Sequence, residues 1–164
     1  NRTLNRNSFF IISSTLILFE GILILKGQWV GDFWEHSAVV NELSKHFMHP
    51  DNPIVNIDIP HAFFSPYSLL VALFSKLTHL NSIQSLQFFA FFNLLLFLSS
   101  FYFLIKSFFK HNYILISSIS LLLILFFWGP KPYYWSGFYH IFVLDKVLPY
   151  PSTFAISLTF LTLS

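Results

Sequence analysis

Long runs of apolar side chains, separated by short polar segments, dominate the sequence of this chain. Residues 8–25, 86–105 and 113–128 each form such a run, and another begins at residue 152 and continues to residue 164. A helix that crosses a membrane needs roughly 20 mostly apolar residues. The pattern therefore predicts an all-α, polytopic membrane protein with three spans and the start of a fourth.

A shorter apolar stretch, YSLLVALFSKLTHL, lies at residues 67–80, between the first and second runs. Lys76 and His79 interrupt it, and its apolar part is shorter than a span requires. A helix of this length is more typical of a segment that lies at the membrane surface. We therefore expect an interfacial helix here, within an outer loop that extends over residues 26–85.

The distribution of basic side chains predicts how the spans are oriented. Arg2 and Arg6 precede the first run, and the turn at residues 106–112 is also basic. Because cytoplasmic loops carry an excess of Lys and Arg, both segments are expected in the cytoplasm. Residues 26–85 and 129–151 then lie outside, which fits an integral protein of the bacterial inner membrane with its site on the outer face.

The composition agrees with a membrane protein and argues against several other classes. Hydrophobic residues make up 55% and charged residues 10% of the chain, whereas soluble domains are about one quarter charged. The net charge of +2 and the scattered Lys and Arg residues argue against nucleic acid as a partner. The absence of cysteine excludes disulfides and thiolate metal sites. Since the chain starts at Asn1 and stops within an apolar run, we expect a fragment of a longer protein.

Polar side chains gather in the first outer loop. Five of the seven acidic residues and four of the seven histidines lie between Gly31 and His61. Within this stretch, residues 33–47 predict an amphipathic helix, because apolar side chains recur at helical spacing. The predicted apolar face is His36, Val40, Leu43 and Phe47, and the predicted polar side is Glu35, Glu42 and His46.

The start of this helix, GDFWEH, holds three polar side chains within about one turn. Asp32 and Glu35 have the spacing of a capping box at a helix N-terminus. A carboxylate at that position is also held ionised by the helix, and it can act as a base or a metal ligand. Asp32 and His36 can face the same divalent metal ion or substrate. Zinc sites need three or four converging ligands, so a divalent metal at Asp32 and His36 and no cofactor at all are both open.

Glu20 is the only acidic residue within the first apolar run. A carboxylate inside a membrane is costly unless it is paired, neutral or facing a cavity. The position therefore marks a candidate functional site. The alternative is that Glu20, which precedes Leu25 by five residues, lies near the outer interface and reaches water.

The second outer segment combines aromatic and charged side chains. Its aromatic residues, Tyr139 among them, have the density of an aromatic belt at a membrane interface. Asp145 and Lys146 form an adjacent charge pair, and Lys131 and His140 add cationic character. Cations at this level would suit a lipid-linked phosphate donor.

Together these motifs resemble the GT-C superfamily of membrane glycosyltransferases, which includes protein O-mannosyltransferases and aminoarabinose transferases. The similarity rests on GDFWEH directly after the first span, IPHAFFSPYSLLVALFSKL leading into the interfacial helix, a basic cytoplasmic turn and an acid in the second outer loop. It covers most of the chain but only the N-terminal part of such an enzyme. The resemblance implies transfer of a sugar from a polyprenyl-phosphate donor in the lipid bilayer to an acceptor at the outer face.

By position, the resemblance also implies roles for polar residues of the two outer loops. Asp32 would be the base that deprotonates the acceptor, and Asp145 would position the acceptor or assist a metal ion. The side chains expected to contact the substrates are Glu35, His36, His61, Lys131, His140 and Lys146. Two other classes stay open: a transporter fragment, in which Glu20 and Asn93 line a polar path between spans, and a non-catalytic membrane scaffold. The oligomeric state is open as well.

Overall fold

All regular elements in the part of the chain that this computed structural model describes are helices. That part comprises residues 2–55, 57, 59, 61–127 and 139–164. The helices are α1 (Arg2–Lys26), α2 (Phe33–Lys45), α3 (Pro66–Thr78), α4 (Ser82–Phe108), α5 (Tyr113–Phe126), α6 (Leu144–Val147) and α7 (Pro151–Leu163). No strand occurs among these residues, so the all-α expectation is confirmed.

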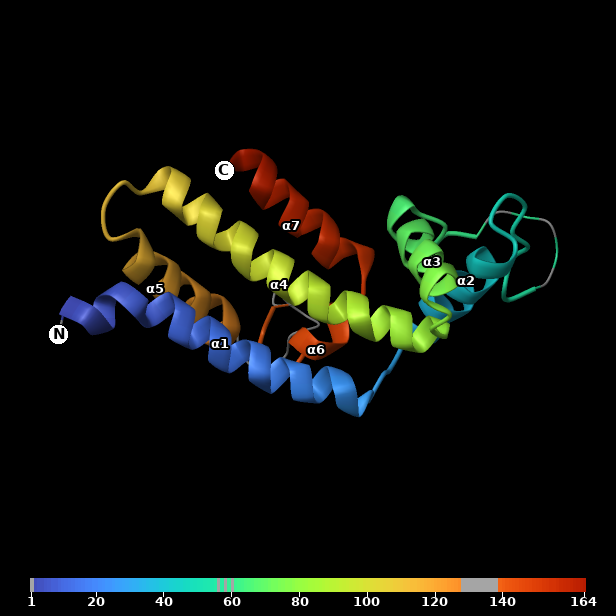
Figure 1. Ribbon diagram of the computed structural model, residues 1–164, viewed down its shortest axis with the longest axis horizontal. Helices are drawn as coiled ribbons and strands as arrows, with labels where there is room; N and C mark the ends of the chain where they lie inside the picture. The colour runs from blue at the N-terminus through green and yellow to red at the C-terminus, as the bar shows by residue number, and fades with distance from the viewer. Residues whose placement is uncertain (1, 56, 58, 60, 128–138) are drawn as a thin grey trace.

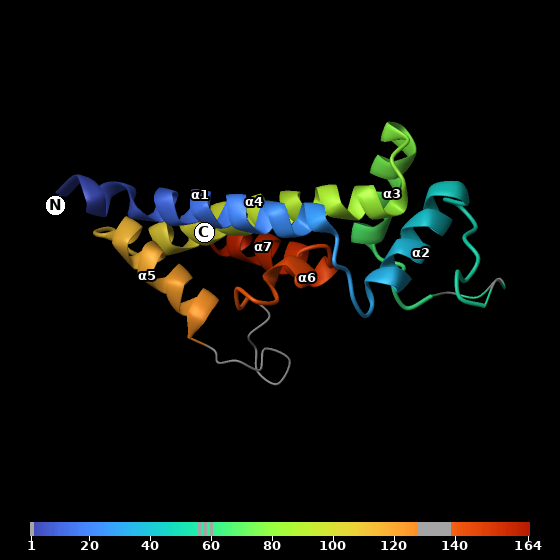
Figure 2. The same cartoon turned by 90° about the horizontal axis from the view of Figure 1, so that it is seen from below.

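Four helices, α1, α4, α5 and α7, form an elongated bundle (Figure 1). α4 is central, because it contacts α1, α5 and α7. α2 and α3 lie together at one end, where α1 stops and α4 begins, and the N-terminus and the α4–α5 turn lie at the other end (Figures 1 and 2). The two segments predicted to be cytoplasmic are therefore at the same end of the bundle.

Two of the described helices are long and apolar enough to cross a membrane: α1, through its Asn7–Lys26 part, and α4. The apolar helix α5 has 14 residues, and at 1.5 Å per residue it is about 21 Å long, short of the roughly 30 Å hydrocarbon core. The third predicted run continues to Trp128, which lies outside the described residues. α7 is likewise a shorter apolar helix. α1 and α4 thus support a membrane protein, and further spans stay a prediction.

Capping boxes fix where α4 and α3 begin. The Asn81 side chain accepts a hydrogen bond from the Gln84 N–H at 2.8 Å, and the Gln84 side chain accepts one from the Asn81 N–H at 3.2 Å. At the start of α3, Ser65 and Ser68 exchange the same two bonds, at 3.2 and 2.8 Å. Each pair satisfies backbone donors that a helix start leaves open. The helix predicted at residues 67–80 is therefore α3, and it crosses the end of α4 (Figures 1 and 2).

α2 is amphipathic, as predicted from its spacing of apolar residues. His36 and Leu43, near the two ends of its predicted apolar face, are buried in a helix that packs against α3 and α4. The expectation that Phe47 continues this face is wrong, because α2 ends at Lys45 and Phe47 is 40% exposed. The helix stops where His46 leaves the helical conformation, at φ −120° and ψ 63°.

Glu20 lies on the packed face of α1, together with Leu16 and Ile24. Its exposed fraction is 0%, and neither carboxyl oxygen has a hydrogen-bond partner within the described part of the chain. The alternative that Glu20 reaches water at the outer interface is therefore wrong. The helical spacing that buries Leu16 and Ile24 places Glu20 on the same side of α1.

A buried hydrogen-bond network joins α4 to α3 and to the corner between α6 and α7. The Asn93 amide donates to the Tyr67 hydroxyl at 2.9 Å and to the Leu148 carbonyl at 2.7 Å. Tyr67 in turn donates to the Pro149 carbonyl at 2.9 Å. All four residues are buried. Breaking the network would leave a carbonyl without a donor in an apolar interior, which is costly.

We expect Asn93→Ala to lower the free energy of unfolding by about 1–2 kcal/mol, because the Leu148 carbonyl then loses its donor. Thermal unfolding in detergent micelles measures the change. Ser99→Ala, at an exposed position of the same helix, is the matched control and should leave the melting temperature unchanged. Equal melting temperatures for the two variants would show that the network does not stabilise the fold.

Candidate functional site

A cavity of about 650 Å³ lies between the α1–α2 connection and the region of α6 and α7. Its lining is Val30, Gly31 and Asp32 on one side and Tyr139, Lys146, Val147, Tyr150, Ser152, Thr153 and Ile156 on the other. The volume is within the range of about 300–1,000 Å³ that is typical of small-molecule sites. The cavity therefore brings an acid of the first outer loop and a cation of the second to one place.

Two glycines and a stacked aromatic pair place Asp32 at this cavity. Gly27 and Gly31 have φ values of 64° and 63°, a region that glycine adopts without steric cost. Between them, Trp29 is buried and stacks on Phe33, with ring centroids 4.3 Å apart. The connection thus turns sharply after α1 and presents the exposed Asp32 to the cavity.

The predicted capping box at the start of α2 does not form. Asp32 occupies the N-cap position, but its side chain makes no capping hydrogen bond. The reason is its backbone, since φ −66° and ψ −8° are helical values, whereas a capping side chain normally extends from an extended backbone. Glu35 is exposed and is not part of the cavity lining. The Asp32 carboxylate is therefore not used by the helix end and stays available at the cavity.

His36, one turn after Asp32, is packed between aromatic rings. Its ring stacks on Phe63 with centroids 4.2 Å apart, and its centroid lies 4.9 Å from that of Tyr150. Burial lowers the pKa of His36, the nearby Asp32 opposes this shift, and the nearby His61 adds to it. His36 is thus a neutral imidazole at neutral pH, and it adjoins the cavity through Tyr150.

His61 approaches the same place from the segment before α3. Its Nδ1 accepts a hydrogen bond from the Phe63 N–H at 3.2 Å, so the proton of the neutral ring is on Nε2. Asp32 and His61 both act electrostatically on His36. The three side chains therefore lie close to one another. Asp58, three residues before His61, lies outside the described residues.

The second outer segment contributes Lys146 to the cavity lining, but not Asp145 or His140. Asp145 is 8% exposed, burial raises its pKa, and Lys146 opposes that shift. It lies close to Glu20 of α1. His140 is buried, and its Nδ1 accepts a backbone N–H bond at 3.3 Å from the segment that leads into α6. Lys131, also expected as a substrate contact, lies outside the described residues.

Two tyrosines of the lining were not among the expected substrate contacts. Tyr139, which the sequence assigned to the aromatic belt, stacks on Phe97 with centroids 4.5 Å apart. Burial raises the pKa of Tyr139 to about 12, and Thr153 partly opposes the shift. Tyr150 is the N-cap residue of α7 and precedes a proline at the first helical position, a sequence signal typical of a helix start. Tyrosine rings offer an apolar face and a hydroxyl together.

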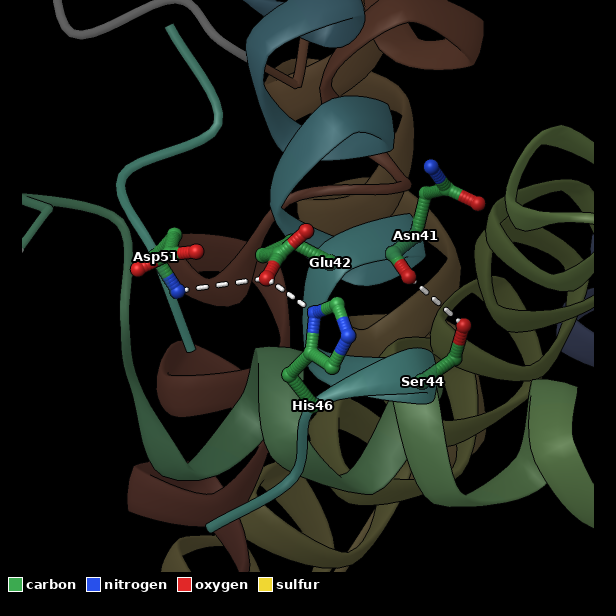
Figure 3. A network of polar contacts seen from close by, with 5 residues as sticks. All are labelled: Asn41, Glu42, Ser44, His46 and Asp51. Atoms are coloured by element: carbon green, nitrogen blue, oxygen red, sulfur yellow. Dashed lines mark hydrogen bonds and ion pairs between the residues drawn. The ribbon is translucent and has the colours of Figure 1, made fainter. Parts of the chain in front are cut away.

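A separate polar network lies at the C-terminal end of α2 (Figure 3). One carboxylate oxygen of Glu42 accepts hydrogen bonds from His46 Nδ1 at 2.7 Å and from the Asp51 N–H at 3.1 Å. The bond from His46 is the main cause that lowers the pKa of Glu42. Beside it, the Ser44 hydroxyl donates to the Asn41 carbonyl at 2.7 Å. Glu42 and His46 therefore share a polar side, as predicted, and they stabilise the loop rather than line the cavity.

Metal binding by Asp32 and His36 stays a prediction. No group of three or more metal-ligating side chains converges among the residues that the structure describes. Asp32 and His36 alone supply two ligands where a zinc site takes three or four. The burial of the His36 ring between Phe63 and Tyr150 further limits its access to an ion in the cavity.

Asp32→Asn is expected to leave stability unchanged, because the Asp32 side chain makes no capping bond. Ser65→Ala removes a cap that does form, and it is expected to lower the free energy of unfolding by about 1 kcal/mol. Thermal unfolding of both variants beside the wild type makes the comparison. A melting temperature that falls equally in both would show that Asp32 stabilises the helix end.

The lowered pKa of His36 predicts a loss of stability in mild acid. The ordinary value is 6.5, so the unfolded chain binds a proton at a pH where the folded protein does not. The contribution of the neutral ring is fully present above about pH 6.5 and declines as the pH falls from there through the lower pKa of the folded state. Melting temperatures measured across this range should fall less in His36→Phe, which keeps a stacking ring. A variant that follows the wild-type pH profile would contradict the prediction.

Comparisons of this chain with protein-family models, curated proteins and solved structures found no match in any of the three.

Proposed function

We propose that this protein is a membrane-bound glycosyltransferase, which transfers a sugar from a polyprenyl-phosphate donor to an acceptor at the outer face of the bacterial inner membrane. The observation that carries the proposal is the cavity where Asp32, Lys146 and two tyrosines meet, toward one end of an apolar helix bundle. An acid can act as the base and a cation can stabilise the leaving phosphate when a sugar is transferred from a phosphate, and tyrosine rings can border the sugar.

The proposed reaction uses the two charged residues of the lining in different roles. Asp32 takes the proton of the acceptor hydroxyl, whose oxygen then forms a bond to the anomeric carbon of the sugar. The bond from that carbon to the phosphate oxygen breaks, and its electron pair leaves with the phosphate. Lys146 stabilises the negative charge on the departing phosphate. Tyr139, which is uncharged at neutral pH, and Tyr150 border the sugar.

The proposed membrane arrangement has α1, α4, α5 and α7 as spans and the N-terminus in the cytoplasm. The N-terminus and the basic α4–α5 turn lie at one end of the bundle, and α2 and α3 lie at the other (Figures 1 and 2), which supports this orientation through the positive-inside rule. The crosswise position of α3 suits a helix at the membrane surface. The cavity then opens on the outer side, where α1 passes into α2.

An apolar groove between α1 and α5 supports a lipid-linked donor. Its volume is about 370 Å³. The lining consists of Ile11, Ile12, Thr15, Leu16, Phe19, Leu122, Leu125, Phe126 and Ile141. Ile141 follows closely after Tyr139 of the cavity lining, so a donor with its head group in the cavity would have an apolar surface nearby for its prenyl chain.

The transporter alternative receives less support from the same geometry. A transport path through the bundle would use Glu20 and Asn93, because transporter sites lie near the membrane midplane. The amide hydrogens of Asn93 are instead used by Tyr67 and Leu148, and the cavity with Asp32 and Lys146 lies where α1 passes into α2. The scaffold alternative is decided by the activity experiment.

Asp32→Asn is expected to lower sugar transfer by at least about 100-fold, since general base catalysis contributes about that much or more. Lys146→Gln should lower it as well, because the leaving phosphate loses a cation. The measurement is transfer of radiolabelled sugar from polyprenyl-phosphate donors by the full-length protein in membranes, with folding checked by thermal unfolding.

Matched controls are Asp51→Asn and Lys45→Gln, which make the same changes of charge at the far end of α2, and both should retain wild-type transfer. Normal transfer by a folded Asp32→Asn protein would contradict its role as the base. A wild-type protein that transfers no sugar from any donor tested would contradict the glycosyltransferase proposal and favour the scaffold or transporter.

A further inference from the structure

The buried carboxyl group of Glu20 has no role in the reaction proposed above. It is 0% exposed, and neither of its oxygens has a hydrogen-bond partner among the described residues. An ionised carboxylate in such a place costs far more than one in water, because no solvent reaches it and the nearby backbone of Asp145 offsets only part of that loss. The group therefore needs a bound positive species.

A second acid lies near Glu20. Asp145 lies close enough to act on Glu20 electrostatically, and the short helix α6 that carries Asp145 packs against α1. Asp145 is itself 8% exposed. Two buried acidic side chains thus lie near each other where α1 packs against α6, and two nearby carboxyl groups in a buried place disfavour each other's ionisation.

The other titratable groups near this pair do not neutralise it. Lys146, next in sequence, acts on Asp145 but lines the cavity. His140 is buried before α6, and its Nδ1 already accepts a backbone N–H. On the other helices packed against α1, the titratable groups are Tyr102 and Lys106 of α4 and Tyr113 of α5. These three lie together, and Tyr102 contacts Phe9, about three turns of α1 before Glu20. One cation is therefore present for two buried acids in this part of the described structure.

A metal ion fits this pair poorly. Hard divalent cations take about six or more oxygen ligands, and no group of three or more metal-ligating side chains converges among the described residues. A proton needs no coordination shell, since it forms a covalent bond to one carboxyl oxygen and makes that acid neutral. Pairs of carboxyl groups that share one proton are a known arrangement.

We propose that Glu20 and Asp145 form a proton-binding site, in which one proton is held between α1 and α6 at neutral pH. The bound proton removes the repulsion between the two acids and so allows α6 to stay packed against α1. Because α6 also carries Lys146, the occupancy of the proton site controls how tightly α6, and with it Lys146, is held at the cavity. The proton site does not depend on which reaction takes place in the cavity.

Infrared spectroscopy of the full-length protein in lipid membranes tests the proposal directly. At neutral pH we expect the carbonyl stretching band of a protonated carboxylic acid, which shifts in heavy water. Glu20→Gln, which keeps the shape of a neutral acid, should remove this band. Glu42→Gln is the matched control, because Glu42 is paired with His46 outside the bundle, and it should retain the band. A wild-type spectrum without the band, or a band that survives in Glu20→Gln, would overturn the proposal.

A second measurement covers the case in which a variant folds poorly. Raising the pH until the band disappears should lower the melting temperature of the wild type, since the two carboxylates then repel each other. Glu20→Gln should show a smaller fall over the same range. A wild-type band that is lost on addition of Mg²⁺ or Ca²⁺ at neutral pH would overturn the proposal in favour of a metal ion. Neither result depends on sugar transfer, so the proton site can fail while the proposed activity stands, or the reverse.

Discussion

The hydrogen bonds of Asn93 are the constraint on which the arrangement of the cavity depends. Asn93 lies in the middle of α4 and is fully buried, so its amide must find acceptors inside the protein. It finds them in the Tyr67 hydroxyl and the Leu148 carbonyl. Tyr67 belongs to α3, and Leu148 lies between Lys146 and Tyr150 of the cavity lining. One side chain of α4 thus fixes the position of the α6–α7 side of the cavity.

The other side of the cavity, formed by the α1–α2 connection, is held to the same helix by a different contact. Gln87 of α4 donates to the Ile24 carbonyl in the last turn of α1 at 3.2 Å, and the chain then turns at Gly27 and Gly31 to present Asp32. Because α4 anchors both walls, Asp32 and Lys146 face one space although they lie far apart in the sequence. The cavity is therefore a property of the packed bundle and not of either outer loop alone.

The regular elements could be predicted because their causes are local. Apolar runs predicted α1 and α4, and helical spacing predicted the buried face of α2 with His36 and Leu43. The end of α2 before Phe47 and the helical backbone of Asp32 were not predicted, because both depend on a few backbone dihedral angles that residue spacing does not determine. Phe47 and the capping box were the two resulting errors.

The candidate site was predicted only in part, for a different physical reason. Asp32, His36 and Lys146 stand out as polar residues in an apolar chain, and the structure places them in or beside the cavity. Tyr139 and Tyr150 do not stand out among so many aromatic residues, and only packing shows that they line the same space. Neighbours brought together by tertiary contacts leave no periodic signal in the sequence.

Asn93 and Glu20 show how two buried polar groups in one bundle can serve different purposes. The side-chain NH2 group of Asn93 has two acceptors and therefore stabilises the structure, although its Oδ1 has no partner among the described residues. The carboxyl of Glu20 has no partner there on either oxygen and lies near a second acid. An unpaired amide oxygen carries no net charge, but a buried acid near Asp145 can persist only with a bound cation or proton. Since Asp145 is next to Lys146 in α6, the charge state inside the bundle is coupled to the cation that faces the cavity. The acids inside the bundle and the cavity are thus electrostatically linked through α6, a helix of four residues.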